Sequence, residues 1–162
     1  PLQLDRCKDL EHLDLSHNYL KAIPPESKDN VNLKTLNLER NRLIHLPETL
    51  NEWTKLESFN VAYNRVESFP DDLTAWSNNL HTLLFDHNQM DEIPKSFSSL
   101  IELTKLSCED NAIRNIDPAA SDYWENLKYF NADNNLIRSL PDTIHKWHML
   151  EYISVRRNKI GM

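Results

Sequence analysis

Glycine is nearly absent from this chain of 162 residues, which contains a single one. Proteins on average contain about 7% glycine. Loops that bind nucleotide phosphates need several glycines, because the backbone must approach the ligand closely. The sequence therefore excludes the P-loop and the dinucleotide-binding fingerprint, and we expect no cofactor.

Cysteine is scarce as well, since Cys7 and Cys108 are the only two and they form no CxxC pair. No asparagine lies in an N-x-Ser/Thr sequon. Disulfides and N-linked glycans are typical of oxidising, secretory environments. Because both signals are missing, we expect a reducing setting, cytoplasmic or nuclear.

Basic residues are in the minority, with 18 Lys and Arg against 25 Asp and Glu and a net charge of -7. A surface that binds nucleic acid draws its affinity from clustered Lys and Arg, so we expect no nucleic-acid partner and favour a basic protein partner. No apolar run approaches the ~18 residues that would span a bilayer, so we expect no membrane insertion.

What the chain does contain is one phrase that recurs every 23 or 24 residues. The phrase has the pattern L-x-x-L-x-L-x-x-N-x-L, with other apolar residues replacing some of the leucines. Its seven copies begin at Leu10, Leu33, Leu56, Leu80, Leu103, Leu127 and Leu150. A period of this length indicates a solenoid, in which each unit buries its apolar face against its neighbours.

Alternation within each phrase predicts a short strand. In the first copy Leu13 and Leu15 would point to one face of that strand, while His12, Asp14 and Ser16 would point to the other. Neighbouring phrases would stack as parallel strands. The asparagine of each phrase can bond backbone groups left unpaired where the chain turns away. These asparagines are Asn18, Asn41, Asn64, Asn88, Asn111, Asn135 and Asn158.

Proline and tryptophan mark the return path between strands. In five copies proline follows an apolar residue, where it fixes the bend without leaving an N–H unpaired. The tryptophans come further on, at Trp53, Trp76, Trp124 and Trp147. We predict that they plug the core under the convex side. Cys7 and Cys108 fall at core positions and are predicted to be small buried apolar residues, too far apart for a disulfide.

These motifs resemble those of the leucine-rich repeat proteins over essentially the whole chain, and seven copies keep the pattern. The resemblance implies an α/β fold, the leucine-rich repeat solenoid, with a curved parallel β-sheet on the concave face and short helical or irregular segments on the convex side. We interpret residues 1–162 as one leucine-rich repeat domain with seven strand-forming repeats. We also expect it to be a segment of a longer array without terminal caps.

Aligning the outward strand positions by repeat singles out one region of the concave face. Four carboxylates cluster there over three consecutive repeats, beside tyrosines and an outward-facing leucine. Tyrosine is a favoured interface anchor because it buries a large ring yet keeps a polar tip. The predicted binding residues are Tyr63, Leu84, Asp86, His87, Lys105, Glu109, Asp110, Tyr129, Asn131, Asp133, Tyr152 and Arg156.

Other interpretations of this region stay open. Carboxylates about 5 Å apart repel one another, which should raise their pKa values unless a cation lies beside them. The cluster could coordinate calcium, or it could be an ordinary solvated acidic face. We favour a contact site for a protein and predict no bound metal. A second candidate surface is the basic end formed by Arg138, Arg156, Arg157 and Lys159.

Catalysis is not supported by the spacing of the polar residues. His12, Asp14 and Ser16 have the composition of a hydrolase triad, but alternate strand residues are ~6.8 Å apart, whereas a base must lie within about 3 Å of its nucleophile. His17 and His87 share a column but are ~14 Å apart, too far to bind one metal. We therefore predict no enzyme activity and no small-molecule substrate.

The leading interpretation is a protein–protein interaction module within an intracellular signalling or scaffold protein. Its concave face would receive a basic or amphipathic partner, with affinity from the tyrosines and Leu84, and with orientation and faster encounter from the acidic residues. One alternative is a regulatory or substrate-recruiting segment of a larger enzyme, such as a phosphatase, kinase, cyclase or GTPase, whose catalytic domain lies outside this chain. Another is a spacer that holds other domains apart.

Overall fold

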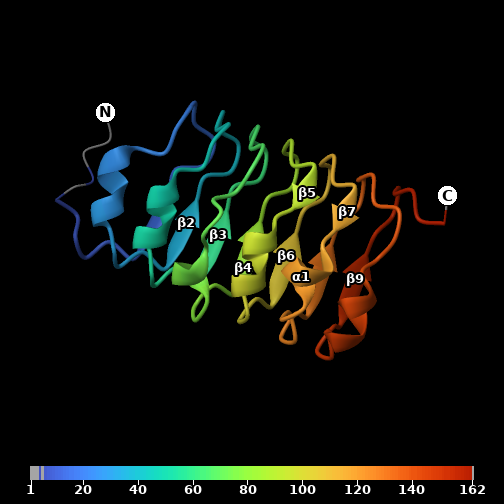
Figure 1. The fold of residues 1–162 in the computed structure, drawn as a ribbon. Helices are drawn as coiled ribbons and strands as arrows, with labels where there is room; N and C mark the ends of the chain where they lie inside the picture. Colours follow the sequence, from blue (N-terminus) through green and yellow to red (C-terminus); the bar gives the residue numbers. More distant parts are fainter. Residues whose placement is uncertain (1–3, 5, 162) are drawn as a thin grey trace.

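A computed structural model describes residue 4 and residues 6–161, and a parallel sheet of seven strands runs along the molecule (Figure 1). Each strand comes from one copy of the repeated phrase. In their order across the sheet the strands are β1 (His12–Asp14), β2 (Thr35–Asn37), β3 (Ser58–Asn60), β4 (Thr82–Leu84), β6 (Lys105–Ser107), β8 (Tyr129–Asn131) and β9 (Tyr152–Ser154). The predicted leucine-rich repeat solenoid with seven strand-forming repeats is confirmed.

The strands alternate as the phrase predicts. In β4 the middle residue Leu83 is buried, whereas Thr82 and Leu84 on either side are half-buried and point to the concave face. Neighbouring strands pair one whole repeat apart, so that Leu83 pairs with Phe59 on one side and Leu106 on the other. Equivalent residues of successive repeats therefore form columns across the sheet.

A turn ends every strand at the same place. The third residue after each strand has a φ between 53° and 56°, in the left-handed region. Asparagine, aspartate and histidine enter this region more readily than other residues that carry a side chain. We call these residues the turn column: His17, Arg40, Tyr63, His87, Asp110, Asn134 and Arg157.

The asparagine after each turn ties neighbouring repeats together. Asn64 Nδ2 donates to the carbonyl of Val61 at 3.0 Å and to that of Leu38, one repeat earlier, at 2.9 Å. Its Oδ1 accepts from the N–H of Leu43 at 2.9 Å. Among the described residues, Asn18 bonds only to carbonyls of its own repeat. The Asn64 pattern recurs at Asn41, Asn88, Asn111, Asn135 and Asn158, as predicted.

Short helices return the chain along the convex side, as expected for this fold. In the described residues these are the 3-10 helices η1 (Pro25–Asp29), η2 (Glu48–Glu52), η3 (Thr74–Trp76), η4 (Lys95–Ser99) and η5 (Asp142–Lys146), and the α-helical turn α1 (Pro118–Ser121). Asp117, directly before α1, caps this helix, because its Oδ1 accepts from the N–H of Ala119 at 2.7 Å. Two further strands, β5 (Glu92–Ile93) and β7 (Asn115–Ile116), pair in parallel as a separate small sheet.

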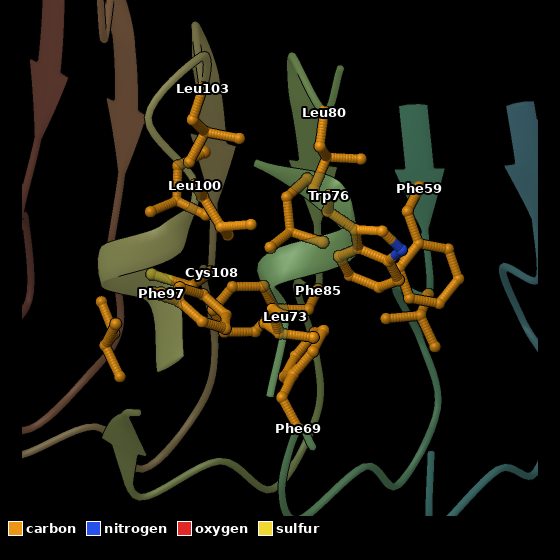
Figure 2. Close-up of a cluster of buried hydrophobic side chains, with 14 of the residues drawn as sticks. Phe59, Phe69, Leu73, Trp76, Leu80, Phe85, Phe97, Leu100, Leu103 and Cys108 are labelled. Carbon is orange, nitrogen blue, oxygen red and sulfur yellow. The ribbon is translucent and has the colours of Figure 1, made fainter. Parts of the chain in front are cut away.

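The core lies between the sheet and the convex helices (Figure 2). All four tryptophans are at most 3% exposed, so their predicted role as core plugs is confirmed. Trp76 packs edge to face on Phe59, with ring centroids 5.5 Å apart, and its indole N–H donates to the carbonyl of Leu50 at 3.2 Å. The other three indoles donate in the same way to carbonyls of the preceding repeat. These bonds join η1 to η2, η2 to η3, η4 to α1, and α1 to η5.

The two cysteines differ in their surroundings, although both are free thiols. Cys108 is fully buried in the core, as predicted. The same prediction is wrong for Cys7, whose side chain is exposed. Cys7 lies in the turn before β1, and no earlier repeat among the described residues packs over it.

Candidate functional site

The twelve predicted binding residues lie in four columns of the concave face. Two columns consist of the first and the third residue of each strand, and another is the turn column. The remaining one, which we call the exit column, lies two residues after each strand and comprises Ser16, Glu39, Ala62, Asp86, Glu109, Asp133 and Arg156.

Exposure divides the predicted residues into three groups. The exposed ones are Tyr63, Lys105, Asp110, Tyr152 and Arg156. The half-buried ones are Leu84, Asp86, His87, Glu109 and Tyr129. Asn131 and Asp133 are buried, at 8% and 3% exposure. A partner on this face would therefore meet the rings and some of the charged groups, whereas Asp133 is out of its reach.

Side chains of the turn column form a continuous stack from Arg40 to Asp110. The guanidinium carbon of Arg40 lies 4.2 Å from the ring centroid of Tyr63. The rings of Tyr63 and His87 stack with centroids 4.1 Å apart. His87 Nδ1 in turn lies 2.9 Å from Asp110 Oδ2. The stack is an aromatic ridge with a cation at one end and a carboxylate at the other.

A second stack lies in the first strand column. Tyr129 and Tyr152 are nearly parallel, at 7°, with ring centroids 4.6 Å apart. Lys105 Nζ lies 5.0 Å from the centroid of Tyr129. An aromatic pair of this kind contributes about 0.5–1.5 kcal/mol beyond the area that it buries. The two tyrosines therefore hold each other in place and offer a preformed apolar surface.

Asp86 is held by the repeat that follows it. Its Oδ1 accepts from Ser107 Oγ at 2.6 Å and from the N–H of Glu109 at 2.7 Å. Burial raises the pKa of Asp86 above its ordinary value, the charge of Glu109 raises it further, and the two hydrogen bonds only partly offset this. The pKa is raised as expected, but its main cause is burial, and repulsion by a neighbouring carboxylate contributes less.

Asp133 occupies the same column two repeats later. It accepts from Ser154 Oγ at 2.5 Å and from the N–H of Arg156 at 2.6 Å. The guanidinium of Arg156 adds an ion pair, with Nε and Nη2 each 2.8 Å from Oδ2. Burial alone would raise the pKa of Asp133, but these bonds and the charge of Arg156 outweigh it, and the pKa is lowered.

Glu109 bonds two amides of the next repeat, with Oε2 accepting from Asn131 Nδ2 at 3.0 Å and Oε1 from Asn134 Nδ2 at 3.2 Å. The four carboxylates of the cluster thus all have contacts within the protein, and Asp133 is both buried and paired. Glu109 and Asp110 remain accessible. The concave face is therefore less acidic toward a partner than the aligned sequence suggests.

The sequence carries a signal for these internal bonds that the alignment of columns does not reveal. Where the third strand residue is asparagine, it caps its own turn, as Asn131 Oδ1 does for the N–H of Asp133 at 3.1 Å. Serine at that position has no carbonyl oxygen to accept this bond. The aspartate of the preceding repeat supplies the oxygen instead. An aspartate followed 21 residues later by serine, as in Asp86 and Ser107, marks this arrangement.

The residues considered for catalysis make other bonds. His12 Nδ1 lies 2.9 Å from Thr35 Oγ1, and Asp14 Oδ1 accepts from the N–H of Ser16 at 2.9 Å. In the described part of the chain no three His, Cys, Asp or Glu side chains gather as metal ligands. No described helix is long and apolar enough to cross a membrane.

Comparisons with known proteins agree with this architecture. Family models described as leucine rich repeats match residues 8–53 and residues 101–160. The solved structure of the leucine-rich repeat protein LIC12759 of Leptospira interrogans matches with a TM-score of 0.72 and 24% identity, over 98% of this chain and 46% of that one. This chain therefore spans less than half the length of that protein. No curated protein sequence matches the chain.

The chain belongs to the leucine-rich repeat family. Domains of this family generally mediate protein–protein interactions and are typically not enzymes. The similarity to LIC12759 supports the fold alone.

Proposed function

We propose that this chain binds a protein through the concave face between Tyr63 and Tyr152, and that the partner presents a basic or amphipathic segment. The observation that carries the proposal is the pair of aromatic stacks on one face, Tyr63 with His87 and Tyr129 with Tyr152. Leu84 lies in a column between them. Rigid rings are favoured anchors because they bury a large area at little entropic cost.

Charge would orient the partner. Glu109 and Asp110 are the accessible carboxylates near the stacks, and Asp110 Oδ2 lies 2.9 Å from His87 Nδ1 at the end of the turn-column stack. An incoming lysine or arginine would find both between the two aromatic surfaces. Such charges increase the rate of encounter and fix the register more than they add affinity.

We further propose that the chain acts as a binding module and not as a catalyst, within a signalling or scaffold protein. A cytoplasmic or nuclear setting is supported by the two cysteines, which are free thiols.

The test replaces concave residues by residues that the same columns already contain. Tyr129→Thr and Tyr152→Ser follow Thr35 and Ser58, and Asp110→Arg follows Arg40 at the same left-handed φ. We expect proteins captured by the wild-type chain from an extract of the source cells to fall at least about tenfold for the triple variant, because the loss of a single interface anchor can cost more than 1 kcal/mol and 1.4 kcal/mol is a tenfold change in affinity. Quantitative mass spectrometry of the captured proteins measures this.

A matched control changes the convex side, with Tyr123→Ser, where the side chain is 56% exposed, and Glu125→Arg. Circular dichroism checks that both variants fold. An unchanged set of captured proteins for the concave variant, or an equal loss for the convex control, would show that the concave assignment is wrong.

A further inference from the structure

A second surface lies on one edge of the solenoid. In each repeat this edge is formed by the residues that directly follow the turn-column residue and its asparagine. Arg114, Leu136, Arg138 and Lys159 surround an open hollow of about 470 Å³, which we call the basic hollow. These residues come from three successive repeats, and Arg114 directly precedes β7. They belong to none of the four concave columns.

The backbone around the basic hollow is fixed by hydrogen bonds between repeats. The N–H of Arg114 donates to the carbonyl of Asp91 at 3.0 Å, that of Leu136 to Ile113 at 2.8 Å, and that of Lys159 to Ile137 at 2.8 Å. Asn158 Oδ1 also accepts from the N–H of Ile137. A ligand would therefore not have to order this part of the chain, which lowers the entropic cost of binding.

Within the described part of the chain, the three cations of the basic hollow form no ion pair. No carboxylate of the described residues lies within 4.0 Å of Arg114, Arg138 or Lys159, although Lys146 and Asp122 form such a pair at 2.6 Å elsewhere. At the other end of the same edge Arg42 stacks on the ring of Tyr19, 4.6 Å from its centroid. Three cations that pair with no described carboxylate are thus gathered at one point of a protein whose net charge is -7.

The hollow also has an apolar part. Leu136 is 37% exposed and lies among the three cations that line the cavity with it. Guanidinium groups bind carboxylates in a bidentate manner, whereas leucine binds only apolar groups. A ligand that satisfies all four residues must therefore be both anionic and apolar. A cavity of this size is within the range of about 300–1,000 Å³ in which ligands are usually bound.

We propose that the basic hollow binds an acidic peptide segment of a partner protein, in which an apolar side chain lies between two carboxylates. The apolar side chain covers Leu136, and the carboxylates meet Arg114, Arg138 and Lys159. This site has the opposite charge preference to the concave face, and it does not depend on the function proposed for that face.

The test is a proton–nitrogen NMR titration of the whole chain with the acetylated, amidated peptide Gly-Asp-Leu-Glu-Gly. We expect saturable shifts at the amides of residues 112–116, 136–139 and 159–161. Replacing both arginines, Arg114→Ala with Arg138→Ala, should weaken binding about tenfold, as expected for the loss of two exposed charge pairs. The control pair Arg42→Ala with Arg65→Ala, on the same edge outside the hollow, should leave the affinity unchanged.

A second arm tests the apolar contact. Leu136→Ser, and a peptide with serine in place of its leucine, should each weaken binding, and the two changes together should weaken it no more than either alone. Inorganic phosphate is titrated in parallel. If phosphate moves the same amides at the same concentration and Leu136→Ser has no effect, the hollow is a simple anion site and the proposal fails. It also fails if the peptide shifts none of these amides, or if the control pair loses as much affinity as the arginine pair.

Discussion

Asp86 and Asp133 lie in the same column, two repeats apart, and each accepts a hydroxyl and a backbone N–H from the repeat that follows. Their pKa values nevertheless shift in opposite directions, up for Asp86 and down for Asp133. Burial is the main cause of the raised pKa of Asp86, and the two sites also differ in the next residue of the exit column, which is Glu109 beside Asp86 and Arg156 beside Asp133. At Asp86 the hydrogen bonds do not offset burial, whereas at Asp133 the hydrogen bonds and the charge of Arg156 together outweigh it.

The largest expected effect is the loss of protein stability when the side chain of Asp133 or of Asp86 is removed. Asp133→Ala removes the acceptor of Ser154 and Arg156 at a buried position, and we expect a loss of about 2–3 kcal/mol in the free energy of unfolding. Asp86→Ala should cost less, about 1–2 kcal/mol, because the ionised Asp86 is already disfavoured by burial. Urea denaturation at pH 7 measures both. An equal or greater loss for Asp86→Ala would contradict the comparison.

The loss of unfolding free energy caused by Asp86→Asn and by Asp133→Asn should change with pH in opposite directions. The raised pKa of Asp86 means that its stabilising contribution is present below its ordinary pKa of 3.8 and is lost as the pH rises through the folded-state value. The lowered pKa of Asp133 means the reverse, a contribution present above 3.8 and lost as the pH falls. Asp86→Asn should therefore cost more stability at pH 3 than at pH 6, and Asp133→Asn more at pH 6 than at pH 3. Urea titrations at both pH values decide, and slopes of the same sign would refute the assignment.

The smallest expected effect is a change in the pKa of each aspartate when the charge of the residue beside it is reversed. Glu109→Arg places a guanidinium beside Asp86 as Arg156 lies beside Asp133, and the pKa of Asp86 should then fall below its ordinary value. The reciprocal change, Arg156→Glu, should raise the pKa of Asp133. Carboxyl carbon chemical shifts followed by NMR over a pH titration report both. A pKa of Asp86 that stays raised in Glu109→Arg would mean that burial, and not the missing cation, sets its direction.

The fold could be predicted from the sequence because it depends on whether each side chain points into the core or toward the concave surface. Period and alternation determine this for Leu83, for the tryptophans and for asparagines such as Asn64, and all lie where the pattern predicts. The burial and pairing of the concave carboxylates depend on which groups of the next repeat each side chain can contact. Alternation along a strand does not predict these contacts. For that reason Asp133 was aligned as a surface group but lies buried against Arg156.

Cys7 and Leu84 illustrate the same limit. For both residues the prediction rests on the column in which they fall. The thiol of Cys7 is exposed, because burial at a core position also requires a neighbouring repeat on each side. Leu84, expected at an exposed position, is half-buried between neighbouring strands. A column predicts the direction of a side chain, and its neighbours determine the degree of burial.

The turn column restricts how this surface can change by mutation. All seven of its residues have the left-handed φ, and none of them is valine, isoleucine or threonine. Branching at Cβ makes that conformation costly, whereas asparagine, aspartate, histidine and other unbranched residues tolerate it. Variants at Tyr63, His87 and Asp110 can therefore exchange rings, amides and charges while the repeat stays folded, but they cannot gain branched apolar side chains. The left-handed backbone of this column therefore limits which side chains can evolve there, whatever partner the surface binds.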